Sequence, residues 1–222
     1  MNIHKLKYLK YKKRYLDIKY GSGLTNNQSL AKYLFDLMKK YSINNTEYAV
    51  VAGYAVAQIT GRRVTDLDVF VSKKAYGKLL ENAATIASKE KNILMISEAE
   101  ISKTPRLFIL SDYGEIEFFE REDTGFPSVT FSLNNLKKNK MLKYDEFGNP
   151  YLNTDATILY YSDVRVNELE QFIIGDNYII SEQRLYKNIS HLHEIYEKIK
   201  TESLKHKIDM LLRLYYTHAF RV

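Results

Sequence analysis

Residues 48–71, YAVVAGYAVAQITGRRVTDLDVFV, decide the fold expected for this chain. The pattern predicts a strand, a glycine turn, a short helix, a loop and a second strand. The second strand carries Asp66 and Asp68, and because side chains alternate along a strand, both carboxylates lie on one face. Two adjacent like charges destabilise a strand unless positive charge lies between them. Hard oxygen ligands suit Mg²⁺, so the pair predicts a divalent-cation site.

Segments with helical periodicity and segments with strand periodicity flank this stretch. Apolar residues recur at spacings of three and four over 30–41, which predicts an amphipathic helix. Downstream, the pattern predicts a helix ending near Lys89. Four short strands are then expected, at 93–96, 106–110, 115–121 and 128–133. The turn Asp112-Tyr113-Gly114 joins the second and third of these strands into a hairpin.

The pattern changes toward the C-terminus. The loop 145–150, DEFGNP, is rich in turn residues and marks a predicted boundary, and 156–161 alternates weakly. Apolar residues recur at helical spacing over 185–199 and again over 204–215, which predicts two helices that form an αα-hairpin. His191 and His193 are expected at the surface, because two residues at this spacing point about 200° apart on a helix.

We therefore predict an α+β fold with a mixed β-sheet flanked by helices and a C-terminal helical hairpin. The expected domains are a basic, Lys/Tyr-rich N-terminal helix or arm at 1–23, a core at 29–143, and a mixed, mainly helical C-terminal subdomain at 151–222.

The net charge of +6 belongs to the N-terminal arm. Residues 1–20 hold seven basic side chains and one acidic one, which leaves 26 basic and 26 acidic side chains in the rest of the chain. The arm is either a solvated helix whose tyrosines pack on the body or on another chain, or a docking arm for nucleic acid or a protein partner. A broad basic face on the body is not expected.

Composition excludes several other classes of protein. The chain has no cysteine, so a disulfide framework or a thiolate zinc site is excluded, and a reducing compartment fits. No apolar run has the length needed to span a bilayer, and the first 20 residues lack the apolar segment of a secretory signal. We therefore expect an intracellular protein with no membrane partner.

Two resemblances add to this interpretation. The segment KYLKYKKRYL at 7–16 resembles the Lys/Tyr-rich leader of many proteins from mimivirus-like giant viruses. That resemblance implies a viral origin, with a location in the host cytoplasm, the virion factory or the virion. Separately, Gly53, the pair Asp66 and Asp68, and the acidic pair at 115–117 resemble the nucleotidyltransferase fold of the DNA polymerase β superfamily, over about 30–123. Minimal and abortive-infection-type members of toxin systems show a similar sub-pattern.

The second resemblance implies a metal-dependent transfer of a nucleoside monophosphate from a nucleoside triphosphate such as ATP to a hydroxyl group. The acceptor is a protein, an RNA or a small molecule, and the cofactor is Mg²⁺ or Mn²⁺. The resemblance makes Asp66, Asp68 and Glu117 the catalytic and metal-binding residues. Glu117 is chosen over Glu115 because EIEFF places it before two apolar residues.

The expected nucleotide contacts surround these acids. Gly53 lets the backbone approach the triphosphate, and the start of the following helix offers free N–H groups. Arg62, Arg63 and Lys73 flank the aspartate strand, where they either meet phosphates or are solvated. Tyr54 replaces the small residue of the family pattern, and it either stacks on a base or indicates an inactive relative.

Two alternatives to an enzyme therefore stand beside the first hypothesis. One is a catalytically inactive nucleotidyltransferase-fold binding module or virion-associated interaction protein. In the other, the acidic pair is coincidental and the chain is an interaction protein with a basic docking arm.

Overall fold

The computed structural model describes residues 27–89, 93–101, 104–123, 131–165 and 178–219. The predicted arm at 1–23 lies outside these residues, as do residues 128–130 of the last predicted strand. In chain order the elements are α2 (Asn27–Lys40), β1 (Tyr48–Val51), α3 (Gly53–Thr60), β2 (Asp66–Val71), α4 (Lys73–Glu81), α5 (Ala83–Lys89), β3 (Ile93–Ile101), β4 (Thr104–Ser111), β5 (Gly114–Glu120), α6 (Leu133–Lys138), β6 (Leu142–Tyr144), β7 (Pro150–Leu152), α7 (Thr154–Tyr160), the π-helix η1 (Tyr161–Arg165), α9 (Tyr178–Lys198) and α10 (Glu202–Ala219).

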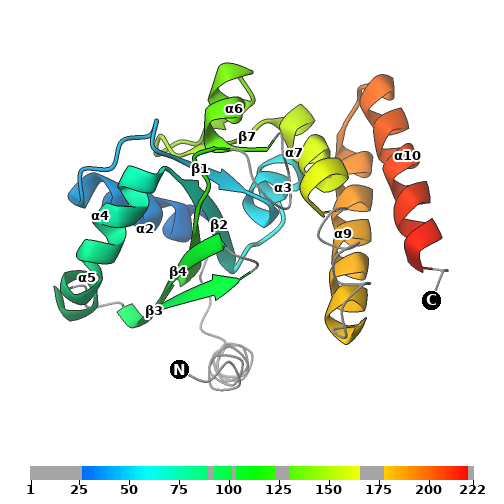
Figure 1. The fold of residues 1–222 in the computed structure, drawn as a ribbon. Coiled ribbons are helices and arrows are strands. Elements are labelled where there is room, and N and C mark those ends of the chain that lie inside the picture. Colours follow the sequence, from blue (N-terminus) through cyan, green and yellow to red (C-terminus); the bar gives the residue numbers. More distant parts are fainter. Residues whose placement is uncertain (1–26, 90–92, 102–103, 124–130, 166–177, 220–222) are drawn as a thin grey trace.

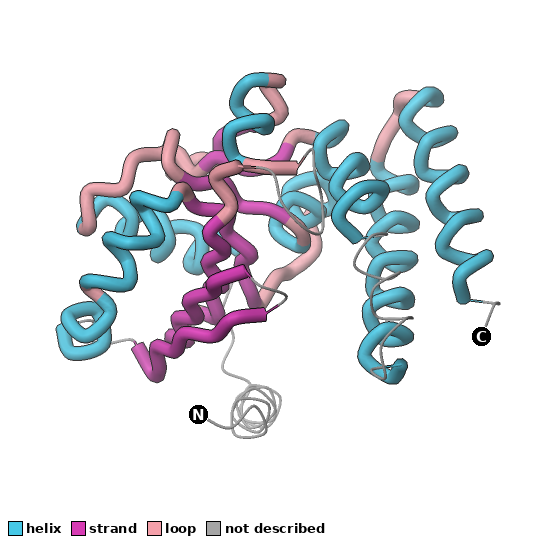
Figure 2. Tube along the Cα trace, in the orientation of Figure 1, coloured by secondary structure: helices cyan, strands magenta, loops and turns pink. Residues whose placement is uncertain are grey.

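Within the described chain, the strands form one mixed sheet of seven, in the spatial order β3-β4-β5-β2-β1-β7-β6 (Figures 1 and 2). The pairs β2–β5 and β1–β7 are parallel, and the other neighbours are antiparallel. Helices α2, α4 and α5 cover one face, whereas α9 and α10 stand side by side beyond α3 (Figure 1). The predicted α+β class, mixed sheet and C-terminal helical hairpin are confirmed. No described helix combines the length and the apolar character needed to cross a membrane.

Three buried apolar clusters hold these layers together, and α3 contributes to each. The first lies between the sheet and α2, α4 and α5, the second lies under α6 and α7 on the opposite face, and the third joins α3 and α7 to α9 and α10. An eight-residue helix that is mostly apolar is stable only when it is enclosed. From α3, Tyr54 and Ala57 belong to the first cluster, Ala55 belongs to the second and Val56 belongs to the third.

A buried polar network ties the β6–β7 loop to α3. Asp145 Oδ1 accepts the Asn149 amide at 2.9 Å, and Asp145 Oδ2 accepts the Tyr54 hydroxyl at 2.8 Å. The Asn149 side chain accepts the Tyr48 hydroxyl at 2.8 Å and donates to the Ala31 carbonyl at 3.0 Å. Because buried polar groups are costly unless they are hydrogen-bonded, this network fixes the loop against α2, β1 and the first turn of α3.

The structure extends the sheet beyond the predicted boundary between 143 and 151. Strand β7 pairs in parallel with β1 through Val50 and Tyr151, and β6 pairs with β7. The turn-rich loop therefore closes a hairpin of the same sheet. The sequence pattern does not reveal this pairing, because strands of three residues carry almost no periodicity.

Two further segments differ from the sequence predictions because capping residues start helices there. Ser132 accepts the Asn135 amide at 3.3 Å and begins α6, so a strand through 133 is wrong. Asn153 accepts the Ala156 amide at 2.9 Å and begins α7, where the sequence alternates only weakly. In both cases local side-chain hydrogen bonds decide the outcome.

We expect Gly114 to be required for stability. Its φ is +147°, and a Cβ at this position would lie 2.6 Å from the Thr65 carbonyl oxygen. Gly114→Ala is therefore expected to lower the free energy of unfolding by about 2 kcal/mol or more. The control is Gly77→Ala in α4, where a Cβ meets nothing within 4 Å. This change should leave stability unchanged or raise it by up to about 1 kcal/mol. Urea denaturation measures both, and equal effects would contradict the expectation.

Candidate active site

Four carboxylates form a two-by-two array on one face of the sheet. In the parallel pairing of β2 with β5, Asp66 lies opposite Glu115 and Asp68 lies opposite Glu117. Neighbouring strands are about 4.8 Å apart, so each pair places like charges side by side. All four side chains are half-buried, whereas the residues between them are fully buried on the other face. The sequence prediction that Asp66 and Asp68 share a face with Glu117 is consistent with this register.

The start of α3 lies beside this array. Val51, the last residue of β1, is paired with Asp68, and the chain then turns at Ala52, with φ 52° and ψ −124°. The first helical hydrogen bond runs from the Val56 amide to the Ala52 carbonyl at 3.2 Å. The three preceding amides, beginning with Gly53, therefore have no acceptor within the helix, and the N-cap residue Ala52 supplies no side-chain cap. Such a helix start attracts anions.

Gly53 leaves open space at this turn. Apart from its chain neighbours and its own helix, a Cβ at Gly53 would meet no atom of the described residues within 4 Å, and its φ is not in the left-handed region. Neither packing nor backbone conformation therefore requires glycine here. The absence of a side chain instead leaves the backbone accessible to a ligand. Ala52, by contrast, is a non-glycine residue with positive φ, which is uncommon and often found at functional sites.

Of the two alternatives for Tyr54, the structure contradicts the outward position needed to stack on a base. Its side chain is only 2% exposed and packs in the first cluster, on the face of the sheet opposite the carboxylates. The hydroxyl donates to Asp145, and the ring meets Tyr151 edge-on with centroids 6.1 Å apart. Burial, followed by the hydrogen bond to Asp145, raises the pKa of this phenol, so it remains a neutral donor. Tyr54 therefore leaves the space beside Gly53 open.

Arg106 on β4 is the functional candidate that sequence reasoning missed. Its Nη1 donates to Glu117 Oε1 at 2.7 Å, and its guanidinium carbon lies 4.6 Å from the centre of the Phe119 ring. The hairpin register places it there, because Phe108 lies opposite Glu117 and Arg106 lies opposite Phe119. Counting outward from the predicted turn at 112–114 would have revealed this neighbour.

The predicted three-carboxylate metal site is not assembled in the described part of the chain. No three acidic, histidine or cysteine side chains converge there closely enough to hold a metal ion. Glu117 is held by Arg106 from the β4 side, whereas Asp68 lies on the β2 side. The donor type still fits a hard divalent cation, because every side chain of the array offers carboxylate oxygen.

The electrostatic environment of Glu117 is unusual for a carboxyl group. The pKa of Glu117 is raised from 4.5 to about 7, first by burial and then by the charge of Asp68, although Arg106 acts in the opposite direction. The Arg106 guanidinium therefore offsets only part of the burial and like charge that act on Glu117. Burial and like charge are the two effects that keep a carboxyl protonated near neutral pH.

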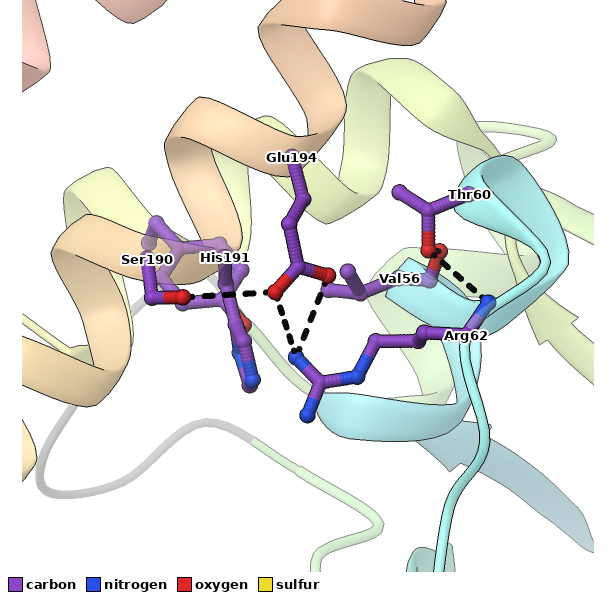
Figure 3. A network of polar contacts seen from close by, with 7 residues as sticks. Val56, Thr60, Arg62, Ser190, His191 and Glu194 are labelled. Atoms are coloured by element: carbon purple, nitrogen blue, oxygen red, sulfur yellow. Dashed lines mark hydrogen bonds and ion pairs between the residues drawn. The ribbon is translucent and has the colours of Figure 1, made fainter.

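The three predicted basic contacts are placed differently from one another. Arg62 donates from Nη1 to both oxygens of Glu194 on α9, at 3.2 and 3.3 Å, as Figure 3 shows. Arg63 is exposed in the loop before β2. Asp66 and Asp68 lie near the start of β2, whereas Lys73 begins α4 just after the end of β2. The backbone positions of Asp68 and Lys73 are five residues apart along extended chain, which is roughly 16 Å. The structure thus does not bring Lys73 to the carboxylates.

The two histidines of α9 differ from each other. His193 is exposed as predicted and shares a 2.9 Å hydrogen bond with Tyr216. The prediction of a surface position is wrong for His191, which is 3% exposed and hydrogen-bonded to the Tyr161 hydroxyl. Their opposite directions on the helix bring the His191 ring edge-on to Tyr161 of the third cluster, with ring centroids 5.9 Å apart, and leave His193 exposed.

Comparisons with known proteins add little to this geometry. No family model matches the chain, and no curated protein does. A solved structure described as a putative nucleotidyltransferase from H. pylori aligns over 86% of this chain and 95% of its own length. Its sequence identity is 9% and its TM-score is 0.38, so this likeness carries no argument about the site. None of these comparisons supports the resemblance of 7–16 to giant-virus leaders.

The raised pKa of Glu117 predicts a pH-dependent stability. The folded protein binds this proton more tightly than the unfolded chain, so the stability contribution is complete below about pH 4.5 and is lost as the pH rises to about 7. Glu117→Gln remains uncharged and should lack this loss. Across that interval, the stability of the variant relative to wild type should rise by on the order of 3 kcal/mol.

Urea denaturation between pH 4 and 8 in the presence of a chelator measures this difference. Parallel curves for the two proteins would contradict the assignment. Glu115→Gln, on the same strand, serves as the matched control.

Proposed function

We propose that this chain is a nucleotidyltransferase that moves a nucleoside monophosphate from a nucleoside triphosphate to a hydroxyl acceptor. One observation carries the proposal. The register that pairs Val51 with Asp68, and Asp68 with Glu117, brings an open helix start beside carboxylates from two strands that are distant in sequence. An anion site next to hard oxygen ligands suits a triphosphate with its divalent cation.

Each part of the site has a role in this reaction. The amides of the first turn of α3, beginning at Gly53, bind the phosphates that leave as pyrophosphate. Asp66, Asp68 and Glu117 would hold Mg²⁺ or Mn²⁺. When bound, the cation neutralises the carboxylates and the charge that develops on the phosphoryl oxygens.

The bond changes are those of a substitution at phosphorus. The oxygen of the acceptor hydroxyl forms a bond to the α-phosphorus and gives its proton to solvent, while the bond from that phosphorus to the bridging oxygen breaks and pyrophosphate leaves. The chain contributes positioning and charge stabilisation, which are the main sources of catalysis in such transfers. Outside residues 1–20 the charges balance, which favours a protein, a small molecule or an RNA end over a long nucleic-acid track.

The Arg106–Glu117 ion pair favours a second candidate function. If the guanidinium stays on Glu117 permanently, the third carboxylate is unavailable, and the chain is a nucleotide-binding module without transferase activity. The open turn at Gly53 is retained in this alternative, so nucleotide binding is expected in both.

A labelling assay tests the catalytic proposal. The full chain with Mg²⁺ or Mn²⁺ and each α-labelled triphosphate is expected to transfer label to itself, to RNA or to a component of an extract. Asp66→Ala/Asp68→Ala should lose the transfer, because its cation ligands are absent. If wild type and double variant give the same blank across all four nucleotides, the catalytic proposal is abandoned. A rise in melting temperature with metal and triphosphate, seen only in wild type, would then favour the binding module.

Gly53→Ala tests the phosphate contact separately from folding. The added methyl group has space in the free protein, so stability should not fall, but it occupies the position where a phosphate approaches. Triphosphate affinity, measured by calorimetry, is expected to fall by about tenfold or more, which is about 1.4 kcal/mol.

Gly77→Ala is the matched control, since it introduces the same methyl group into open space on α4. Its triphosphate affinity should equal that of wild type. Unchanged affinity in Gly53→Ala would remove the helix start from the site.

A further inference from the structure

Lysine side chains from two helices converge on the loop that precedes β1. Lys78 of α4 donates from Nζ to the Ser42 carbonyl at 2.6 Å. Lys137 of α6 donates from Nζ to the Thr46 carbonyl at 2.8 Å. These two hydrogen bonds hold the ammonium groups of both helices at the same short loop, 42–47.

Lys74 of α4 brings a third ammonium group to this loop. Its Nζ lies 3.9 Å from Glu47 Oε1 and its side chain is 74% exposed, so this ion pair contributes little to stability. The other Glu47 oxygen accepts the Asn44 amide at 2.9 Å, so the one acidic residue of the loop is engaged within the loop itself. We refer to Lys74, Lys78 and Lys137 as the lysine cluster.

The lysine cluster keeps donors that a ligand can use. An ammonium group has three N–H donors, and the contact of Lys78 or Lys137 with its carbonyl uses one of them. Among the described residues, no carboxylate forms an ion pair with either lysine. Positive charge that the protein's own acids do not neutralise attracts a polyanion.

The loop adds backbone donors to these ammonium groups. The Glu47 amide donates to the Asn44 carbonyl at 2.8 Å, which closes a turn over 44–47. The two central residues, Asn45 and Thr46, are exposed, and their amides have no acceptor in the part of the chain that the structure describes. Successive backbone amides in a turn form a site that favours anions.

We propose that the lysine cluster and the turn 44–47 bind the phosphate backbone of a nucleic acid. Ammonium groups neutralise phosphates, and backbone amides and the side chains of Asn and Thr donate hydrogen bonds to phosphate and sugar oxygens. An anionic membrane fits less well, because membrane-surface segments insert large apolar side chains. None of the large apolar side chains that are exposed in the described chain belongs to the loop 42–47.

This surface is separate from the candidate active site. Glu47 directly precedes the first residue of β1, whereas Val51, at the other end of β1, is paired with Asp68. Binding there requires neither phosphoryl transfer nor a cation, so the inference goes beyond the proposed function. The charges outside residues 1–20 balance in total, yet the contacts of the lysine cluster gather positive charge at one loop.

Lys74→Gln/Lys78→Gln/Lys137→Gln removes the charge of the lysine cluster from the full chain. Binding of a fluorescently labelled single-stranded RNA, followed by anisotropy over a series of KCl concentrations, is expected to weaken by about tenfold or more at low salt. The slope of log affinity against log salt concentration should become shallower by about 2, because each neutralised phosphate of a single strand contributes about 0.7.

The control is Lys187→Gln/Lys198→Gln/Lys207→Gln, which removes the same charge from exposed positions of α9 and α10. It should bind the RNA as wild type does, with the same salt dependence. An equal weakening in the two triple variants would overturn the inference, because net charge alone would then explain the binding. So would unchanged affinity in the variant of the lysine cluster.

Lys74→Arg/Lys78→Arg/Lys137→Arg keeps the charge and should retain the salt dependence of wild type. If the triple Gln variant does not fold, Lys74→Gln replaces it, and the slope should then become shallower by about 0.7. Vesicles of phosphatidylcholine and phosphatidylserine provide the other polyanion. A variant of the lysine cluster that loses vesicle binding but keeps RNA binding would overturn the choice of a nucleic acid.

Discussion

The parallel pairing of β2 with β5 is the constraint on which the candidate site depends. These strands are separated in sequence by two helices and a hairpin, yet they lie side by side with Asp68 opposite Glu117. If one strand shifted by one residue along the other, Leu67 or Ile116 would point to the face that now carries the carboxylates. The acids of that strand would then point into the first apolar cluster. Because Leu67 and Ile116 are fully buried, the apolar core fixes the register and the carboxylates follow.

Much of this arrangement could be predicted from sequence, because it depends on local periodicity. The spacing of apolar residues predicted α2, and alternation in DLDVFV and EIEFFE placed the acids on one face of each strand. The turn before β5 predicted the hairpin. Strands β6 and β7 were beyond this reasoning, because their identity comes from pairing with distant partners and not from their own residues.

The directions of individual side chains were harder to predict. Tyr54 replaces a small residue in the expected pattern, and sequence alone suggested an obstruction. The structure turns it to the other face, where Asp145, distant in sequence, receives its hydroxyl. Arg106 was overlooked although the hairpin register placed it beside Glu117. In both cases the deciding partner comes from another element, so no local pattern contains it.

Because α3 is enclosed on three sides, the shortest piece of the chain that keeps the candidate site folded includes more than the sheet. Val56 packs against the C-terminal hairpin, and Arg62, just after the helix, is paired with Glu194 of α9. Trimming the chain to the sheet and its nearest helices would therefore uncover one side of the helix whose first turn lies beside the acids.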